Sequence, residues 1–81
     1  MKARITVTLK AGILDPQGKA IEGALKSLGI AGVAGVRQGK VFDIEIAGSD
    51  RDGAAASLKD AAEMLLANTV IENYDIRLIA E

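Results

Sequence analysis

Hydrophobic and polar residues alternate near the start of the chain and again further along it. Residues 3–9 place Ala, Ile, Val and Leu at every second position, which is typical of a strand with one buried and one solvated face. The same alternation recurs at residues 41–46 and 74–78. We therefore predict an amphipathic strand at each of these ranges.

Residues 14–28 predict a first helix with a clear start and stop. Asp15 can accept a hydrogen bond from the free amides of the first turn, and Pro16 supplies a preset φ at the first helical position. Gly29 can adopt the left-handed conformation that ends a helix. Apolar residues recur between these signals at helical spacing, so we expect one buried stripe made by Ala20, Ile21, Ala24, Leu25 and Leu28.

A second helix is predicted after the polar loop at residues 48–53, which holds more than one possible cap. The helix is expected to end near Ala67, with Asn68 as a left-handed stop. Its predicted apolar stripe consists of Leu58, Ala61, Ala62, Leu65 and Leu66.

The glycine-rich segment between the first helix and residue 41 is harder to assign. Val33 and Val36 are its main apolar anchors, so we predict a short, irregular strand at residues 33–38. A turn at Gln38 and Gly39 would then join this strand to residues 41–46 in a hairpin. The order strand, helix, strand, strand, helix, strand predicts an α+β, ferredoxin-like β-α-β-β-α-β domain over residues 1–81, with a four-stranded antiparallel sheet and two helices on one face.

The small size of the chain favours association with another chain. A domain of 81 residues has a small core, and the absence of cysteine and histidine excludes disulfides and the usual zinc sites. Val70, Ile71 and Tyr74 crowd a connector that should be polar. They either cover the end of the core or form an apolar contact patch for a second chain, and we predict a dimer.

Charge and aromatic content argue against two classes of partner. Ten basic and eleven acidic residues give a net charge of −1, and the chain has only two aromatic residues, so we expect no nucleic-acid binding. No stretch approaches the ~20 apolar residues of a membrane span, and the N-terminus lacks the apolar run of a signal peptide. We expect a cytoplasmic protein without membrane contact.

Candidate chemistry is sparse. Without His or Cys, the familiar nucleophilic triads cannot be built. Asp50 and Asp52 are interpreted as caps and helix-dipole partners, and no metal site is predicted. Arg37 and Lys40 either present donors to an anion or an acidic partner, or are solvated charges beside a turn.

Three stretches together resemble one family. They are Leu-Asp-Pro-Gln-Gly at residues 14–18, Val-Arg-Gln-Gly-Lys at residues 36–40, and residues 66–74. The chain resembles the PurS family, the small subunit of phosphoribosylformylglycinamidine synthase, over essentially its whole length. The resemblance implies a non-catalytic subunit of a purine-biosynthetic ligase complex.

In that family's reaction, a glutaminase subunit releases ammonia and a large synthetase subunit uses ATP and magnesium to activate the substrate amide. The resemblance implies that this chain binds no cofactor itself. It implies a homodimer, or a tetramer, that bridges the two other subunits and supports ammonia transfer.

The resemblance also implies contact residues for the partner or the dimer. They lie in the first helical turn, the predicted hairpin tip and the connector before the last strand: Asp15, Gln17, Gly18, Arg37, Gly39, Lys40, Asn68, Val70, Ile71, Glu72 and Tyr74. Gly18 stands out because glycine in a helix costs up to ~1 kcal/mol relative to alanine, which predicts a close approach by other backbone.

Two alternatives remain open. A small ACT-like regulatory dimer would share the predicted element order and bind an amino acid or similar ligand. An enzyme that uses Asp43 and Glu45 is less favoured, because both carboxylates belong to the expected wet face of a strand.

Overall fold

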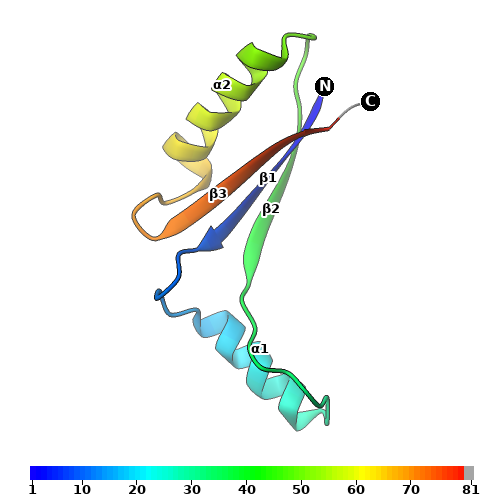
Figure 1. The fold of residues 1–81 in the computed structure, drawn as a ribbon, viewed down its shortest axis with the longest axis vertical. Coiled ribbons are helices and arrows are strands. Elements are labelled where there is room, and N and C mark those ends of the chain that lie inside the picture. The colour runs from blue at the N-terminus through cyan, green and yellow to red at the C-terminus, as the bar shows by residue number, and fades with distance from the viewer. Residues whose placement is uncertain (80–81) are drawn as a thin grey trace.

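A three-stranded antiparallel sheet forms the centre of the computed structural model, which describes residues 1–79 (Figure 1). Its strands are β1 (Lys2–Leu9), β2 (Gly39–Glu45) and β3 (Glu72–Ile79), in the order β2-β1-β3. The register places Ile5 of β1 opposite Phe42 of β2 and Ile76 of β3. The central strand β1 therefore carries the main core side chains between two partners.

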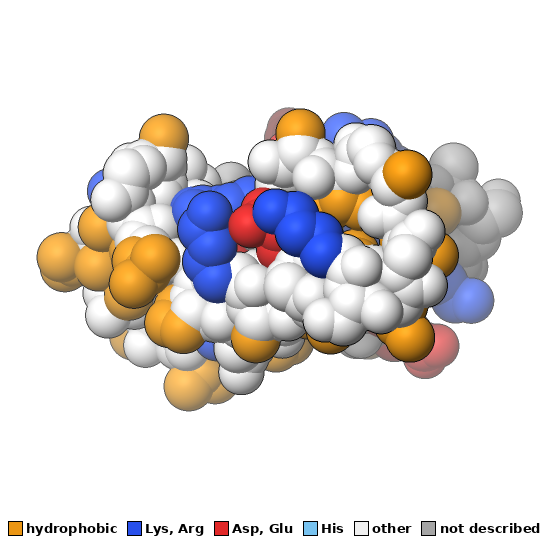
Figure 2. Space-filling view, turned by 90° about the horizontal axis from the view of Figure 1, so that it is seen from below, with side chains coloured by type: hydrophobic (Ala, Val, Ile, Leu, Met, Phe, Trp, Pro, Cys, Tyr) orange, Lys and Arg blue, Asp and Glu red, His pale blue; other side chains and the backbone are white. Residues whose placement is uncertain are grey.

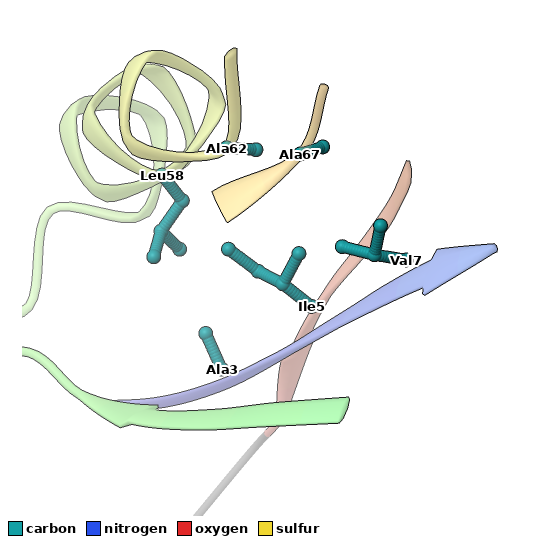
Figure 3. Close-up of a cluster of buried hydrophobic side chains, with 6 residues drawn as sticks. All are labelled: Ala3, Ile5, Val7, Leu58, Ala62 and Ala67. Carbon is teal, nitrogen blue, oxygen red and sulfur yellow. The ribbon is translucent and has the colours of Figure 1, made fainter. Parts of the chain in front are cut away.

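One face of the sheet is covered by α2 (Arg51–Ala61), which continues into a π-helical turn, η1 (Ala62–Leu66). Figure 3 shows Leu58 of α2 pointing toward Ile5 of β1. Both side chains are almost fully buried. The buried cluster consists of Ala3, Ile5, Val7, Leu58, Ala62 and Ala67.

The helix α1 (Pro16–Ser27) projects away from the end of the sheet and covers neither face (Figure 1). The radius of gyration is 16.1 Å, whereas a compact chain of this length would have about 12 Å. The accessible surface is 5724 Å², whereas about 4,600 Å² is expected for a compact chain of this mass. The single chain thus exposes roughly 1,100 Å² more surface than a compact domain would.

The three amphipathic strands are confirmed, but the fourth predicted strand is wrong. Residues 33–38 form no strand, and β2 pairs with β1 instead of forming a hairpin with this segment. The segment has only Val33 and Val36 as half-buried anchors, and their spacing of three does not fit the two-residue period of a strand. Residues 36–38 lie against the start of α1 instead.

The first helix is confirmed in its position and its caps, but its buried stripe is wrong. Asp15 is the N-cap, Pro16 begins the helix, and Gly29 has a φ of +80°. Ile21 and Leu28 are nevertheless exposed at 40% and 75%. The two helices do not share a face of the sheet, and the fourth strand is missing among the described residues, so the predicted ferredoxin-like β-α-β-β-α-β order is not confirmed. The ACT-like alternative, which would share that order, is therefore not favoured.

The second helix is confirmed with two corrections at its C-terminal end. Leu65 is 83% exposed although it was predicted in the buried stripe. Leu65 lies inside the wider π turn of η1, where α-helical spacing no longer applies, so the predicted spacing fails there. Asn68 is not left-handed, because no residue other than glycine has a positive φ in the described chain, and Ala67 ends the turn in an extended conformation.

Candidate functional site

A hollow of about 400 Å³ lies where the sheet meets the start of α1. Polar and charged side chains from the first helical turn, the start of β2 and the start of β3 share its wall. The fold therefore brings together parts of all three stretches that the sequence singled out. The residues around the hollow are Val7, Leu9, Asp15, Pro16, Gln17, Gln38, Gly39, Lys40 and Glu72.

The carboxylate of Asp15 is the buried polar group of this site, with the residue only 5% exposed. Its Oδ2 accepts a hydrogen bond from the backbone N–H of Gln38 at 2.7 Å, and its Oδ1 accepts one from Gly18 at 2.9 Å. These bonds, from Gln38 first and Gly18 second, hold the pKa of the Asp15 carboxyl below its usual value. The carboxylate thus caps α1 and joins the two chain segments that flank it.

Two glycines allow close backbone approach at this site. A Cβ on Gly18 would collide with the carbonyl oxygen of Val36, which confirms the predicted close approach at this position. A Cβ on Gly39 would lie 2.7 Å from the carbonyl oxygen of Val7, on the neighbouring strand. Both positions therefore exclude larger residues for intrachain packing reasons.

Arg37 and Lys40 do not flank a hairpin turn. The Arg37 guanidinium donates to the carbonyl oxygens of Ile13 at 2.9 Å and Lys10 at 3.1 Å, in the connection before α1. The Lys40 ammonium lies 3.8 Å from a carboxylate oxygen of Glu72. Figure 2 shows basic and acidic side chains side by side on this end of the molecule. Both cations therefore have acceptors within the chain.

The predicted contact segment begins with a tight, locally bonded turn. The N–H of Asn68 donates to Glu72 Oε1 at 2.7 Å, and the Asn68 side chain accepts from the N–H of Val70 at 3.2 Å. Ile71 is half-buried and accepts a backbone hydrogen bond from Lys10 at 2.9 Å. The turn is thereby tied to the connection between β1 and α1.

Tyr74 is half-buried on β3, and its hydroxyl donates a short hydrogen bond to the Glu63 carboxylate of η1. This bond, together with burial, raises the pKa of Tyr74. Tyr74 thus joins the sheet to the π turn.

Three large apolar side chains stand out around this segment, and we call them the apolar patch. Met64 is 85% exposed, Leu65 is 83% exposed and Val70 is 79% exposed. Of these three residues, only Val70 was predicted to contact a partner, because helical spacing assigned Leu65 to the core and gave no role to Met64. A π turn has no clear signal in the sequence, so these two residues could not have been found by spacing.

Two of the other carboxylates that were weighed as candidates, Asp43 and Asp50, have structural partners. Asp43 accepts from Arg4 at 2.8 Å across the strands, and this hydrogen bond lowers the pKa of Asp43. Asp50 caps α2 by accepting from the N–H of Gly53 at 3.1 Å. Among residues 1–79, no group of three or more acidic side chains is placed to hold a metal ion.

Within the described part of the chain, every helix is too short or too polar to cross a bilayer.

Curated relatives match nearly the whole chain. The Mycobacterium leprae protein "Phosphoribosylformylglycinamidine synthase subunit PurS" is 52% identical over 75 residues, which are 93% of this chain and 91% of that protein. The Bacillus subtilis protein of the same name is 47% identical over 73 residues, which are 90% and 86% of the two chains.

Solved structures agree with these relatives. Bacillus subtilis PurS superposes with a TM-score of 0.83 at 45% identity and covers 94% of both chains. A chain from the structure of PurLQS from Thermotoga maritima gives a TM-score of 0.88 at 32% identity, with coverage of 96% of this chain and 95% of that chain. The family model PurS, described as phosphoribosylformylglycinamidine (FGAM) synthase, matches residues 2–80. The chain therefore belongs to the PurS family of FGAM synthase subunits.

Proposed function

We propose that this chain is the small, non-catalytic subunit of an FGAM synthase complex. In this role it bridges a glutaminase subunit and a large synthetase subunit, which uses ATP and magnesium, and it supports the passage of ammonia between them. The observation that carries the proposal is the family match over residues 2–80, together with the similarity to a chain of the PurLQS structure. The functional groups of the site also have intrachain partners, which suits a structural role.

A homodimer is the second part of the proposal. Four large apolar side chains in α1 and next to its ends are exposed: Leu14, Ile21, Leu28 and Ile30, at 69%, 40%, 75% and 51%. Hydrophobic side chains are also plentiful on the end of the molecule seen in Figure 2. The excess surface of roughly 1,100 Å² is comparable to the ~800 Å² that each partner buries in a standard interface. These features support burial of α1 against a second copy.

The apolar patch is proposed as the surface that contacts another subunit of the complex. Its three side chains are large and exposed by at least 79%, two of them in η1 and one in the turn that follows it. Methionine is enriched in protein interfaces, and an exposed apolar cluster of this kind is uncommon on a monomer surface. The remaining predicted contact residues Gln17, Lys40 and Glu72 would add polar contacts near the hollow.

Size-exclusion chromatography with light scattering tests the proposal. We expect the chain alone to have twice the mass of one copy at micromolar concentration. With the matching glutaminase and synthetase subunits, glutamine, ADP and magnesium, we expect it to elute in a larger complex. A monomer alone and no shift with the partners would overturn the proposal.

Two variants distinguish the proposed dimer surface at α1 from the apolar patch. Leu28→Glu on α1 should give a monomer, whereas Leu65→Glu in the apolar patch should leave the dimer intact and weaken only the larger complex. Arg77→Glu, at an exposed position of β3 away from both surfaces, serves as the control and should change neither mass.

A further inference from the structure

The two irregular segments that connect α1 to the sheet hold each other by reciprocal side-chain bonds. The first segment, residues 10–15, carries Asp15, whose carboxylate binds the backbone of the second. The second, residues 30–38, carries Arg37, whose guanidinium binds the backbone of the first. Each segment therefore contributes one charged side chain that is hydrogen-bonded to the main chain of the other.

Asp15 provides the tie from the first segment to the second. The same carboxylate accepts from Gly18 within the helix and from Gln38 across the gap, at 2.9 and 2.7 Å. Because the residue is buried, these hydrogen bonds are protected from exchange with water. Gly18 lets the carbonyl group of Val36 come close enough for the segments to stay in register.

Arg37 provides the tie in the opposite direction. Its Nη1 donates to Ile13 at 2.9 Å, and its Nη2 donates to Lys10 at 3.1 Å. The planar guanidinium presents several donors in a fixed arrangement, so one side chain can fix two points of a loop at once. The charge on the donor strengthens both hydrogen bonds.

These ties matter because α1 has no extensive packing on the strands, α2 or η1. The substantial contacts among the elements join β1, β2, β3, α2 and η1, and α1 is absent from them. An irregular backbone without packing or bonds samples many conformations. The direction of α1 relative to the sheet must therefore be set where the two segments meet.

We infer that Asp15 and Arg37 form a clasp that fixes the angle between α1 and the sheet. They are positioning residues, because they act by holding α1 in one direction. The inference concerns the geometry of the single chain and does not depend on which subunits the protein contacts. It assigns Asp15 and Arg37 a positioning role within the chain.

A distance measurement between spin labels tests the clasp. The chain has no cysteine, so labels can be placed at Lys26→Cys on α1 and Lys59→Cys on α2, both at exposed positions. The longest extent of the molecule is 48 Å. Labelled protein is mixed with an excess of unlabelled protein, so that distances between copies do not contribute. Double electron–electron resonance should give one narrow distance peak.

Asp15→Asn breaks the clasp while keeping the helix cap. Asparagine is as good an N-cap as aspartate, but its amide group cannot accept at both oxygen positions, so one bond is lost. We expect an unchanged helical circular dichroism signal and loss of the single narrow peak. Asp50→Asn is the matched control, because Asp50 caps α2 with no bond to another segment, and it should keep the peak.

Arg37→Gln and Arg37→Lys test the second tie without touching the cap. Lysine keeps the charge but lacks the planar fork, so both variants should broaden the distance distribution as Asp15→Asn does. Arg77→Gln should behave like the wild type. If Asp15→Asn and Arg37→Gln both keep the narrow peak, α1 is positioned by something else and the inference is wrong.

Discussion

At the scale of single residues, the environment of Asp15 explains why one acidic side chain matters more than its neighbours. Its carboxylate is buried and bonded to two backbone N–H groups, from Gln38 and Gly18. Asp50 occupies the same position at the start of α2, yet it makes a single cap bond at an exposed site. Two residues with the same local signal therefore have different roles, and only the tertiary contacts distinguish them.

The lowered pKa of Asp15 predicts a dependence of stability on acid. The native pKa lies below the unfolded value of about 3.9, so the ionised carboxylate stabilises the fold above about pH 4. This contribution is lost as the pH falls through the native pKa. Urea unfolding at fixed protein concentration from about pH 5 downward should show a smaller loss of unfolding free energy in Asp15→Asn than in the wild type.

Arg77→Gln, which leaves every carboxylate in place at an exposed position, is the control for this prediction and should follow the wild type. Asp43, whose pKa is lowered by Arg4, adds to the acid loss equally in all three proteins. Equal pH slopes for Asp15→Asn and the wild type would contradict the assigned role of the carboxylate.

Substitution by alanine is expected to change stability in opposite directions at two glycines of α1. At Gly18 a Cβ would collide with the Val36 carbonyl group, so Gly18→Ala should destabilise the protein by about 1–3 kcal/mol. Gly23 has nothing within 4 Å of the same position, so Gly23→Ala should stabilise the helix by about 0.5–1 kcal/mol. Chemical denaturation measures both values, and a shared sign would refute the packing explanation.

At the scale of elements, local patterns predicted more than long-range ones. The strands, the cap at Asp15 and the stop at Gly29 follow from spacing and turn chemistry within a few residues. The irregular path of residues 33–38 depends on bonds to residues far along the chain, such as Asp15, so its sequence alone suggested a strand. The sequence singled out the three stretches that line the hollow, but it could not predict that they lie together, because their proximity depends on the tertiary fold.

The π turn η1 distinguishes two leucines that the helical spacing placed in the same buried stripe. Leu58 is 2% exposed and Leu65 is 83% exposed. Leu58→Ala should therefore destabilise the protein by about 2–4 kcal/mol, whereas Leu65→Ala should change stability by less than about 0.5 kcal/mol. Thermal or urea unfolding of the two variants decides the point, and a large loss for Leu65→Ala would mean that η1 packs differently.

At the scale of the whole molecule, the single chain exposes more surface than a compact domain would. This is the feature that bears most on its proposed assembly. The sheet and α2 enclose a small core, while α1 extends beyond it (Figure 1). The large apolar side chains of Ile21 and Leu28 are exposed. A domain of this size gains little net stability from its own core, so association can supply what the fold lacks. The clasp, the α1 surface and the apolar patch then have complementary roles in one proposed assembly.

The most direct test of the proposed function is the rate of FGAM formation by the matching glutaminase and synthetase subunits, measured with and without this chain. Glutamine and free ammonia are compared as nitrogen sources. We predict that glutamine-dependent formation requires the chain, whereas formation from added ammonia by the large subunit persists without it. Equal glutamine-dependent rates in the presence and absence of the chain would contradict the proposed role.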